Sequence, residues 1–107
     1  MKNQKLKISE RTWQEQVGSM LDLFRWRWFH LEDWRDRRAG PRTTSYAAGF
    51  PDIVAVRGSE MLWIELKSST GTLTGPQKEW LADLQGAGQE VHVLRPGDFE
   101  WLTERLR

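Results

Sequence analysis

Residues 49–56 read GFPDIVAV, and residues 61–67 read MLWIELK. Pro51 has no N–H to give to a ladder of hydrogen bonds, so it suits the first position of a strand. Residues 53–56 form a short apolar run rich in β-branched side chains, which is typical of a buried strand. Residues 57–60 carry turn chemistry, and the second stretch is apolar until near its end. Together they predict two neighbouring strands.

The charged side chains of these strands are Asp52, Glu65 and Lys67. Because side chains alternate between the two faces of a strand, Glu65 and Lys67 point the same way and Leu66 points the other way. A charged pair on one face of an otherwise buried strand is costly unless something compensates it, as a metal ion and a phosphate would. We therefore expect Asp52, Glu65 and Lys67 to meet at one spot, where the carboxylates can hold a divalent metal.

The composition limits the chemistry of such a site. A chain of 107 residues is expected to form one domain that buries roughly two thirds of the surface of its unfolded chain. There is no cysteine, so the available metal ligands are carboxylates, histidines and backbone oxygens, a set that favours Mg²⁺ or Mn²⁺. With no apolar run near the ~20 residues of a membrane span and no signal-peptide pattern, we expect a cytoplasmic protein.

Charge is distributed unevenly, although the net charge is only +1. Residues 1–8 read as a loose basic arm before the domain. Residues 32–48 read as a long loop with arginines and hydroxyls suited to phosphate oxygens, since guanidinium forks and hydroxyls match such acceptors. The candidate DNA contacts in that loop are Arg35, Arg37, Arg38, Arg42 and Ser45. The alternative is a solvated surface of mixed charge.

The first predicted helix begins after Ser9, which can cap it. Its apolar positions fall at helical spacing: Trp13, Val17, Met20, Leu21 and Phe24. Glu10 lies near the centre of that stripe and is expected to face inward, whereas Glu15 lies almost opposite. Glu10 can equally be a first-turn acid favoured by the helix dipole, so both interpretations stay open.

Residues 25–31 alternate as a strand with Trp26, Trp28 and His30 on one face. Core packing is the favoured interpretation of the tryptophans, over stacking on bases. His30 is either a satisfied core or surface histidine or a residue that lines the site.

The second predicted helix opens at Thr74 with a capping box whose third position is Gln77. Gln77 is thus explained by the cap, and a role beside the charged strands is its alternative. Residues 90–94 alternate as a strand, and Asp98 can cap a last helix. The predicted fold is α/β, with helix, three strands, helix, strand and helix in order and a mixed sheet flanked by helices.

These features resemble the PD-(D/E)XK nuclease superfamily, whose restriction-endonuclease-like core has the order αβββαβ. Within it the sequence is similar to the VRR-NUC branch, which includes small stand-alone proteins of bacteria and bacteriophages. The resemblance covers about residues 10–93 and rests on the following residues: Gly49 to Asp52, Glu65 to Lys67, Gly71, Leu73, Thr74, Gln77 to Leu81, Leu84 and Gly88. The order of strands and helices makes this signal stronger than Asp52, Glu65 and Lys67 alone.

The resemblance implies roles for individual residues. Asp52, Glu65 and the backbone carbonyl of Leu66 would bind Mg²⁺ or Mn²⁺. Lys67 would orient or help to deprotonate the attacking water, or stabilise charge at the phosphate. Glu10, Gln77 and His30 would line the same site as the family's helix acid, glutamine and histidine.

It also implies an activity, a metal-dependent DNA endonuclease acting on branched DNA as Holliday-junction resolvases do, located in the host cytoplasm if the gene is a phage's. A single domain presents one active site and a junction needs two incisions, so a homodimer is expected. Two alternatives remain, a non-catalytic nucleic-acid-binding module that keeps the nuclease fold and an interaction domain in which the charges form a buried ion network.

Overall fold

The computed structural model describes residues 7–31 and 48–107 of the chain. Its elements are α1 (Glu10–Leu23), β1 (Arg27–His30), β2 (Ile53–Arg57), β3 (Glu60–Leu66), α2 (Gly75–Gly86), β4 (Glu90–Leu94), the 3₁₀ turn η3 (Pro96–Asp98) and α3 (Phe99–Leu106). The predicted α/β order is confirmed. Within the described ranges, no helix combines the length and apolar character needed to cross a membrane.

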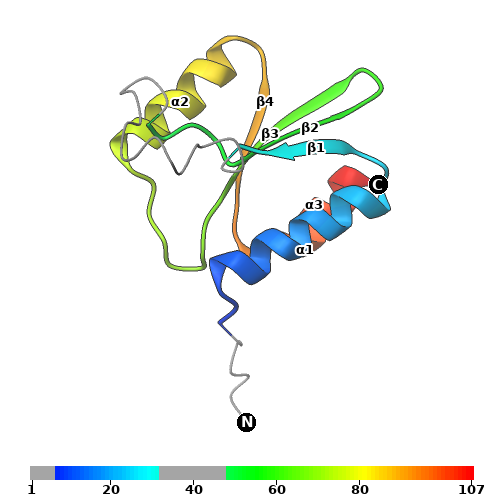
Figure 1. Cartoon of the computed structure of the whole chain (residues 1–107). Helices are drawn as coiled ribbons and strands as arrows, with labels where there is room; N and C mark the ends of the chain where they lie inside the picture. Colours follow the sequence, from blue (N-terminus) through cyan, green and yellow to red (C-terminus); the bar gives the residue numbers. More distant parts are fainter. Residues whose placement is uncertain (1–6, 32–47) are drawn as a thin grey trace, which may run out of the picture.

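The four strands form one mixed sheet in the order β1-β2-β3-β4 (Figure 1). β1 pairs with β2 and β2 pairs with β3 in antiparallel fashion, whereas β3 and β4 run parallel. Helix α2 connects the two parallel strands, as such a pair requires a crossover rather than a hairpin. As a result, the carboxyl ends of β3 and β4 and the start of β2 lie at the same end of the sheet.

Helices α1 and α3 lie on one face of the sheet and α2 lies on the other (Figure 1). The main core fills the space between the sheet and helices α1 and α3. It includes Ile53, Ala55, Leu62, Ile64, Trp13, Val17, Leu21, Leu102 and Leu106. Burial of each large apolar side chain stabilises the fold by roughly 1.5–3 kcal/mol. In contrast, no residue of α2 is fully buried.

Helix α1 is capped and packed as its sequence predicts. The Ser9 hydroxyl accepts from the Thr12 N–H at 3.1 Å. Gly18 lets the helix approach β1 closely, because a Cβ there would lie 2.9 Å from the ring of Trp28. The indole N–H of Trp28 in turn donates to Asp22 at 2.8 Å. This contact fixes the helix over the first strand.

Several strand boundaries differ from the prediction: Arg57 and Glu60, expected in the turn, belong to β2 and β3. The starts of β1 and β2 are shifted as well. The strand expected from Arg25 begins at Arg27, because Arg25 adopts a left-handed conformation (φ 64°) and its N–H still bonds to Asp22 in the turn that ends α1. Pro51 and Asp52 precede β2 rather than opening it, since β2 begins at Ile53. These differences leave the faces of the strands as predicted.

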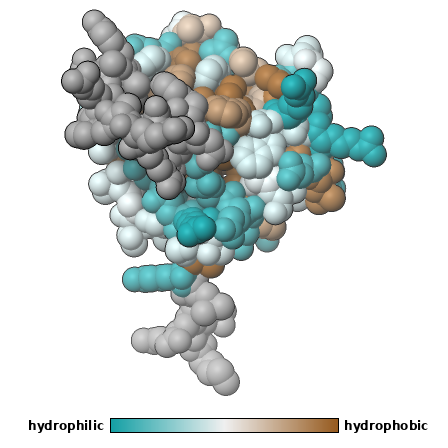
Figure 2. Space-filling view, in the orientation of Figure 1, coloured by the Kyte–Doolittle hydropathy of each residue, from teal (hydrophilic) through white to brown (hydrophobic). Residues whose placement is uncertain are grey.

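The tryptophan nearest each end of α1 is a core residue, as predicted. Trp13 and Trp26 are buried, and their indole N–H groups donate to the carbonyls of Leu94 and Leu106, each at 3.0 Å. Apolar residues that reach the surface are scattered over several elements, and Figure 2 shows apolar surface as separate brown patches among teal and white residues.

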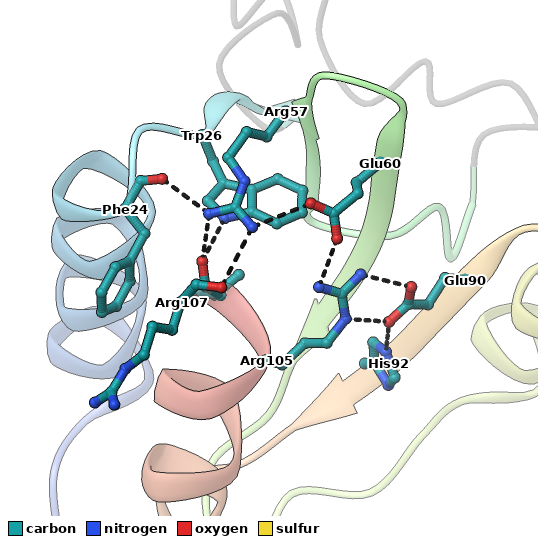
Figure 3. A network of polar contacts seen from close by, with 9 residues as sticks. Phe24, Trp26, Arg57, Glu60, Glu90, His92, Arg105 and Arg107 are labelled. Atoms are coloured by element: carbon teal, nitrogen blue, oxygen red, sulfur yellow. Dashed lines mark hydrogen bonds and ion pairs between the residues drawn. The ribbon is translucent and has the colours of Figure 1, made fainter.

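An ion-pair network joins the last helix to the hairpin between β2 and β3 (Figure 3). Arg57 donates to the carbonyls of Phe24 and Leu106, at 3.0 and 2.6 Å. Arg105 donates to both oxygens of Glu90 at 2.8 Å and to Glu60 at 3.0 Å.

The two guanidinium groups of this network, Arg57 and Arg105, lie over the ring of Trp26. Hydrogen bonding to Arg105 lowers the pKa of Glu90 to about 2. The network therefore fastens α3 to the sheet at the end opposite Asp52.

Candidate active site

The start of β2 and the end of β3 bring two carboxylates together. Ile53 pairs with Ile64, so Asp52 lies directly beside the end of β3. There its Oδ2 accepts a hydrogen bond from the Leu66 N–H at 2.8 Å. The bond across the two strands fixes Asp52 next to Glu65, which is the arrangement that the sequence predicts.

Glu65 is a buried carboxylate with only one of its oxygens engaged. Its side chain is 3% exposed. Oε2 accepts from the Gln77 side chain at 2.9 Å and lies 3.8 Å from the Lys67 ammonium. Oε1 is buried and has no hydrogen-bond partner among the residues that the structure describes. A buried oxygen in this state is costly unless something else occupies its lone pairs.

Gln77 both caps α2 and contacts the charged strands, the two roles that its sequence context leaves open. Its side-chain oxygen accepts from the Thr74 backbone N–H at 2.9 Å. The backbone N–H of Gln77 donates to the Thr74 hydroxyl at 3.2 Å, which completes the capping box. Its side-chain NH₂ remains available and donates to Glu65. Because an amide carries an acceptor and a donor on separate atoms, the cap fixes the group that orients Glu65.

The peptide before Asp52 packs directly on the start of α2. Gly49 has φ +82°, and a Cβ there would lie 2.5 Å from the Gln77 nitrogen and from the Pro76 carbonyl carbon. The next side chain, Phe50, packs against Trp63 and Trp80 with ring centroids 5.6 and 4.7 Å apart.

This junction sets the distance between Asp52 and Gln77. Sequence reasoning missed the structural role of Gly49, although the glycine itself, three residues before an acid, was the available signal.

The two carboxylates of the site, Asp52 and Glu65, outnumber its one described ammonium, that of Lys67. The pKa of Glu65 is raised to about 8, chiefly by burial and next by the charge of Asp52, with Lys67 acting in the opposite direction. A divalent cation fits such a place, because the donors are hard oxygens, one buried oxygen has no partner among the described residues, and the carboxylates repel each other. Among the residues described, no group of three or more His, Asp or Glu forms a metal site, and Asp52 and Glu65 are the carboxylates that this part of the chain brings together here.

Glu10 differs from the inward-facing prediction. It is exposed, because the buried stripe of α1 begins only at Trp13. Its charge nevertheless contributes to raising the pKa of Glu65. As a first-turn acid it also fits the helix dipole. Glu15 is exposed and pairs with Arg11 at 3.7 Å.

His30 ends β1 beside the backbone of Asp52. It is buried, and its Nδ1 lies 3.3 Å from the side-chain nitrogen of Gln14. The following N–H, of Leu31, donates to the Asp52 carbonyl at 2.7 Å. Gln14 had not been singled out from the sequence, since nothing in the helical pattern distinguishes it from a surface glutamine.

The predicted DNA contacts of the long loop lie outside the described residues. These are Arg35, Arg37, Arg38, Arg42 and Ser45. The site described above thus combines side chains from α1, β1, β3 and α2 with Asp52, just before β2, and Lys67, just after β3.

Comparison with known protein families agrees with this geometry. The model of the VRR-NUC domain matches residues 30–96, which include Asp52, Glu65, Lys67 and Gln77. Neither the curated proteins nor the solved structures contain a match to the chain. Because the family match spans more than half of the sequence, the chain belongs to the VRR-NUC family of the PD-(D/E)XK nuclease superfamily, and its function is of the nuclease type.

Proposed function

We propose that the protein is a metal-dependent endodeoxyribonuclease that hydrolyses phosphodiester bonds of DNA. The observation that carries the proposal is the buried Glu65, whose Oε1 lacks a hydrogen-bond partner in the described structure while Asp52, Lys67 and Gln77 surround it. Perturbed carboxylates in such surroundings are more common at functional sites than elsewhere.

Asp52, Glu65 and the backbone carbonyl of Leu66 are the groups that would hold Mg²⁺ or Mn²⁺. When bound, such an ion polarises the phosphate and lowers the pKa of a coordinated water. The bond from the Leu66 N–H keeps Asp52 in place, and the bond from Gln77 leaves the second oxygen of Glu65 directed elsewhere. Both carboxylates are therefore oriented before a ligand arrives, which saves reorganisation during the reaction.

Lys67 is the proton-handling and charge-stabilising group of the proposal. In hydrolysis, a water oxygen attacks phosphorus and loses a proton, one P–O ester bond breaks, and the departing oxygen takes up a proton. Lys67 Nζ, 3.8 Å from Glu65 Oε2, would accept the proton of the attacking water as the neutral amine, or donate to a phosphate oxygen as the ammonium. Glu10 and His30 complete the rim of the site in this proposal.

The proposed substrate is branched DNA, and the proposed active form is a homodimer of one domain spanning residues 1–107. Residues 1–8 and the loop residues Arg35, Arg37, Arg38, Arg42 and Ser45 would contact phosphates. Two incisions in one junction require two active sites, and exposed apolar residues on several elements leave surface for a second copy.

The test compares the wild type with Asp52→Asn on duplex, single-stranded, flapped and four-way DNA, with Mg²⁺ or Mn²⁺ and with EDTA. We expect cleavage that needs the ion, is strongest on the four-way junction, and falls at least ~100-fold in the variant. The control is Asp83→Asn, which removes the same charge from an exposed position on α2 and should leave cleavage unchanged.

Equal cutting by the wild type and Asp52→Asn would refute the proposal. Binding of DNA with no cutting, unaffected by EDTA, would instead favour the non-catalytic binding module. Sedimentation at tens of micromolar tests the dimer separately, since a monomer mass would remove only that part.

A further inference from the structure

Arg95 lies beside the candidate active site, and no feature of the sequence had drawn attention to it. It follows the last residue of β4, and because β3 and β4 run parallel, its neighbour across the sheet is the residue after β3. The Lys67 N–H donates to the Leu94 carbonyl at 3.0 Å, which ties the two strand ends together. Arg95 is thus adjacent to the backbone of Lys67.

The guanidinium of Arg95 holds the turn that follows Lys67. Its Nη1 donates to the carbonyls of Ser68 and Gly71, both at 2.6 Å. The Arg95 N–H donates to Asp98 at 2.7 Å, so its own backbone is anchored on η3. Hydrogen bonds from a charged donor are stronger than neutral ones, and here a single nitrogen closes both ends of one turn.

The turn in question, residues 68–71, passes near the side chain of Lys67 at Gly71. A Cβ added at Gly71 would be 3.6 Å from Cδ of Lys67 and 3.0 Å from the Ser68 hydroxyl. The Gly71 N–H donates to that hydroxyl at 2.9 Å. Residues 67–74, which the structure describes throughout, have no helix or strand of their own, so the contacts of Arg95 replace the support that regular structure would give.

We infer that Arg95 is a positioning residue for Lys67, acting through the 68–71 turn. The inference rests on the proposed function, in which Lys67 handles charge and a proton at the phosphate. By bridging two carbonyls, Arg95 holds the turn against the methylenes of Lys67 and so limits where the ammonium can reach. Displacement of a reacting group by about 1 Å can lower a rate on the order of 100-fold.

The kinetic test uses Arg95→Gln, Arg95→Lys and the control Arg107→Gln, whose exposed side chain lies on the last residue of the chain. We expect Arg95→Gln to lower kcat by roughly 10- to 100-fold with little change in KM. Arg95→Lys, which keeps a charged donor, should recover part of that loss, and Arg107→Gln should change nothing.

A double-mutant cycle then tests whether Arg95 acts through Lys67. In a Lys67→Ala background, Arg95→Gln should lower kcat less than about two-fold further, because the residue that it positions is gone. An equal loss in both backgrounds would overturn the inference.

A third measurement is independent of activity and keeps the inference separate from the proposed function. In hydrogen exchange on the intact protein, Arg95→Gln should speed exchange of the Gly71 amide roughly ten-fold while the amides of β2 and β3 stay protected. Unchanged exchange at Gly71 would overturn the positioning role even if the wild type cuts no DNA. An inactive wild type with faster exchange at Gly71 would refute the proposed function alone.

Discussion

Glu65 is the residue at which folding and the proposed chemistry oppose each other. Within the described structure one oxygen of this buried carboxylate has no partner, which destabilises the native state, and an apolar or neutral side chain in its place would not carry the cost of a buried charge. Proteins keep such destabilising residues at functional sites, where a bound ligand offsets the loss of folding stability. The hydrogen bond from Gln77 orients the group without neutralising it.

Glu65→Gln is therefore expected to stabilise the protein when divalent ions are removed. Burial raises the pKa of Glu65 from 4.5 to about 8. A pKa that is higher in the folded state than in the unfolded state favours folding at low pH, and this contribution is lost as the pH rises from about 4.5 to 8. Thermal unfolding in EDTA should show a gain for the variant that grows over this range to on the order of 2 kcal/mol.

Addition of Mn²⁺ provides the control for this prediction. The wild type should then gain stability and the variant should gain little, because a ligand that binds only the folded state stabilises it by mass action. A variant less stable than the wild type at pH 8 in EDTA would contradict the claim that ionised Glu65 is a cost to the fold.

At the scale of elements, the site depends on one junction between a strand entry and a helix start. The start of α2 carries the capping box that fixes Gln77, and the residues before β2 carry Asp52. Gly49 joins the two, since no side chain fits between its Cα and the backbone of Pro76 and Gln77. The fold positions the acids through backbone contact as well as through side-chain packing.

Gly49→Ala tests that junction against a matched control. Gly88 has the same φ of +82° but nothing within 4 Å of its Cβ position, so Gly88→Ala measures the conformational cost alone. That cost is about 1–2 kcal/mol. Gly49→Ala should cost roughly 1–3 kcal/mol more, because the backbone of α2 must shift. Urea unfolding of both variants gives the difference, and equal losses would mean that the junction tolerates a side chain.

At the scale of the whole molecule, periodicity and turn chemistry predicted the order of the elements and the meeting of Asp52, Glu65 and Lys67. These features are local, since alternation within a strand and a hairpin of known length fix which side chains share a face. The exposure of Glu10 depends on how far along α1 the core extends. A helical wheel gives only the direction of a side chain around the helix axis.

The contacts of Gly49 and Arg95 were not predicted for a related reason. They join residues far apart in the sequence through backbone atoms, and the residue type alone does not say which distant backbone it meets. The dual role of Gln77 was likewise undecided until the distance to Glu65 was known.

The attachment of the last helix gives a prediction for the molecule as a whole. Arg105 on α3 bonds to Glu90 on β4 and to Glu60 on the hairpin, and it lowers the pKa of Glu90 to about 2. A carboxylate whose pKa is lowered by folding stabilises the native state above its unfolded pKa near 4.5, and this stabilisation is lost as the pH falls toward 2.

Arg105→Gln should therefore lose roughly 1 kcal/mol at pH 7, a figure that allows for solvent screening of these half-exposed acids. It should also lose less than the wild type on acidification from pH 5 to pH 2, because Glu90 then titrates nearer its ordinary pKa. Unfolding curves across that range measure both effects, with Arg107→Gln as the control, since its contact with Glu104 is exposed and 3.7 Å long. Parallel pH profiles for Arg105→Gln and the wild type would show that the ion pairs do not hold α3 in place, and that attachment would then rest on the burial of Leu102 and Leu106.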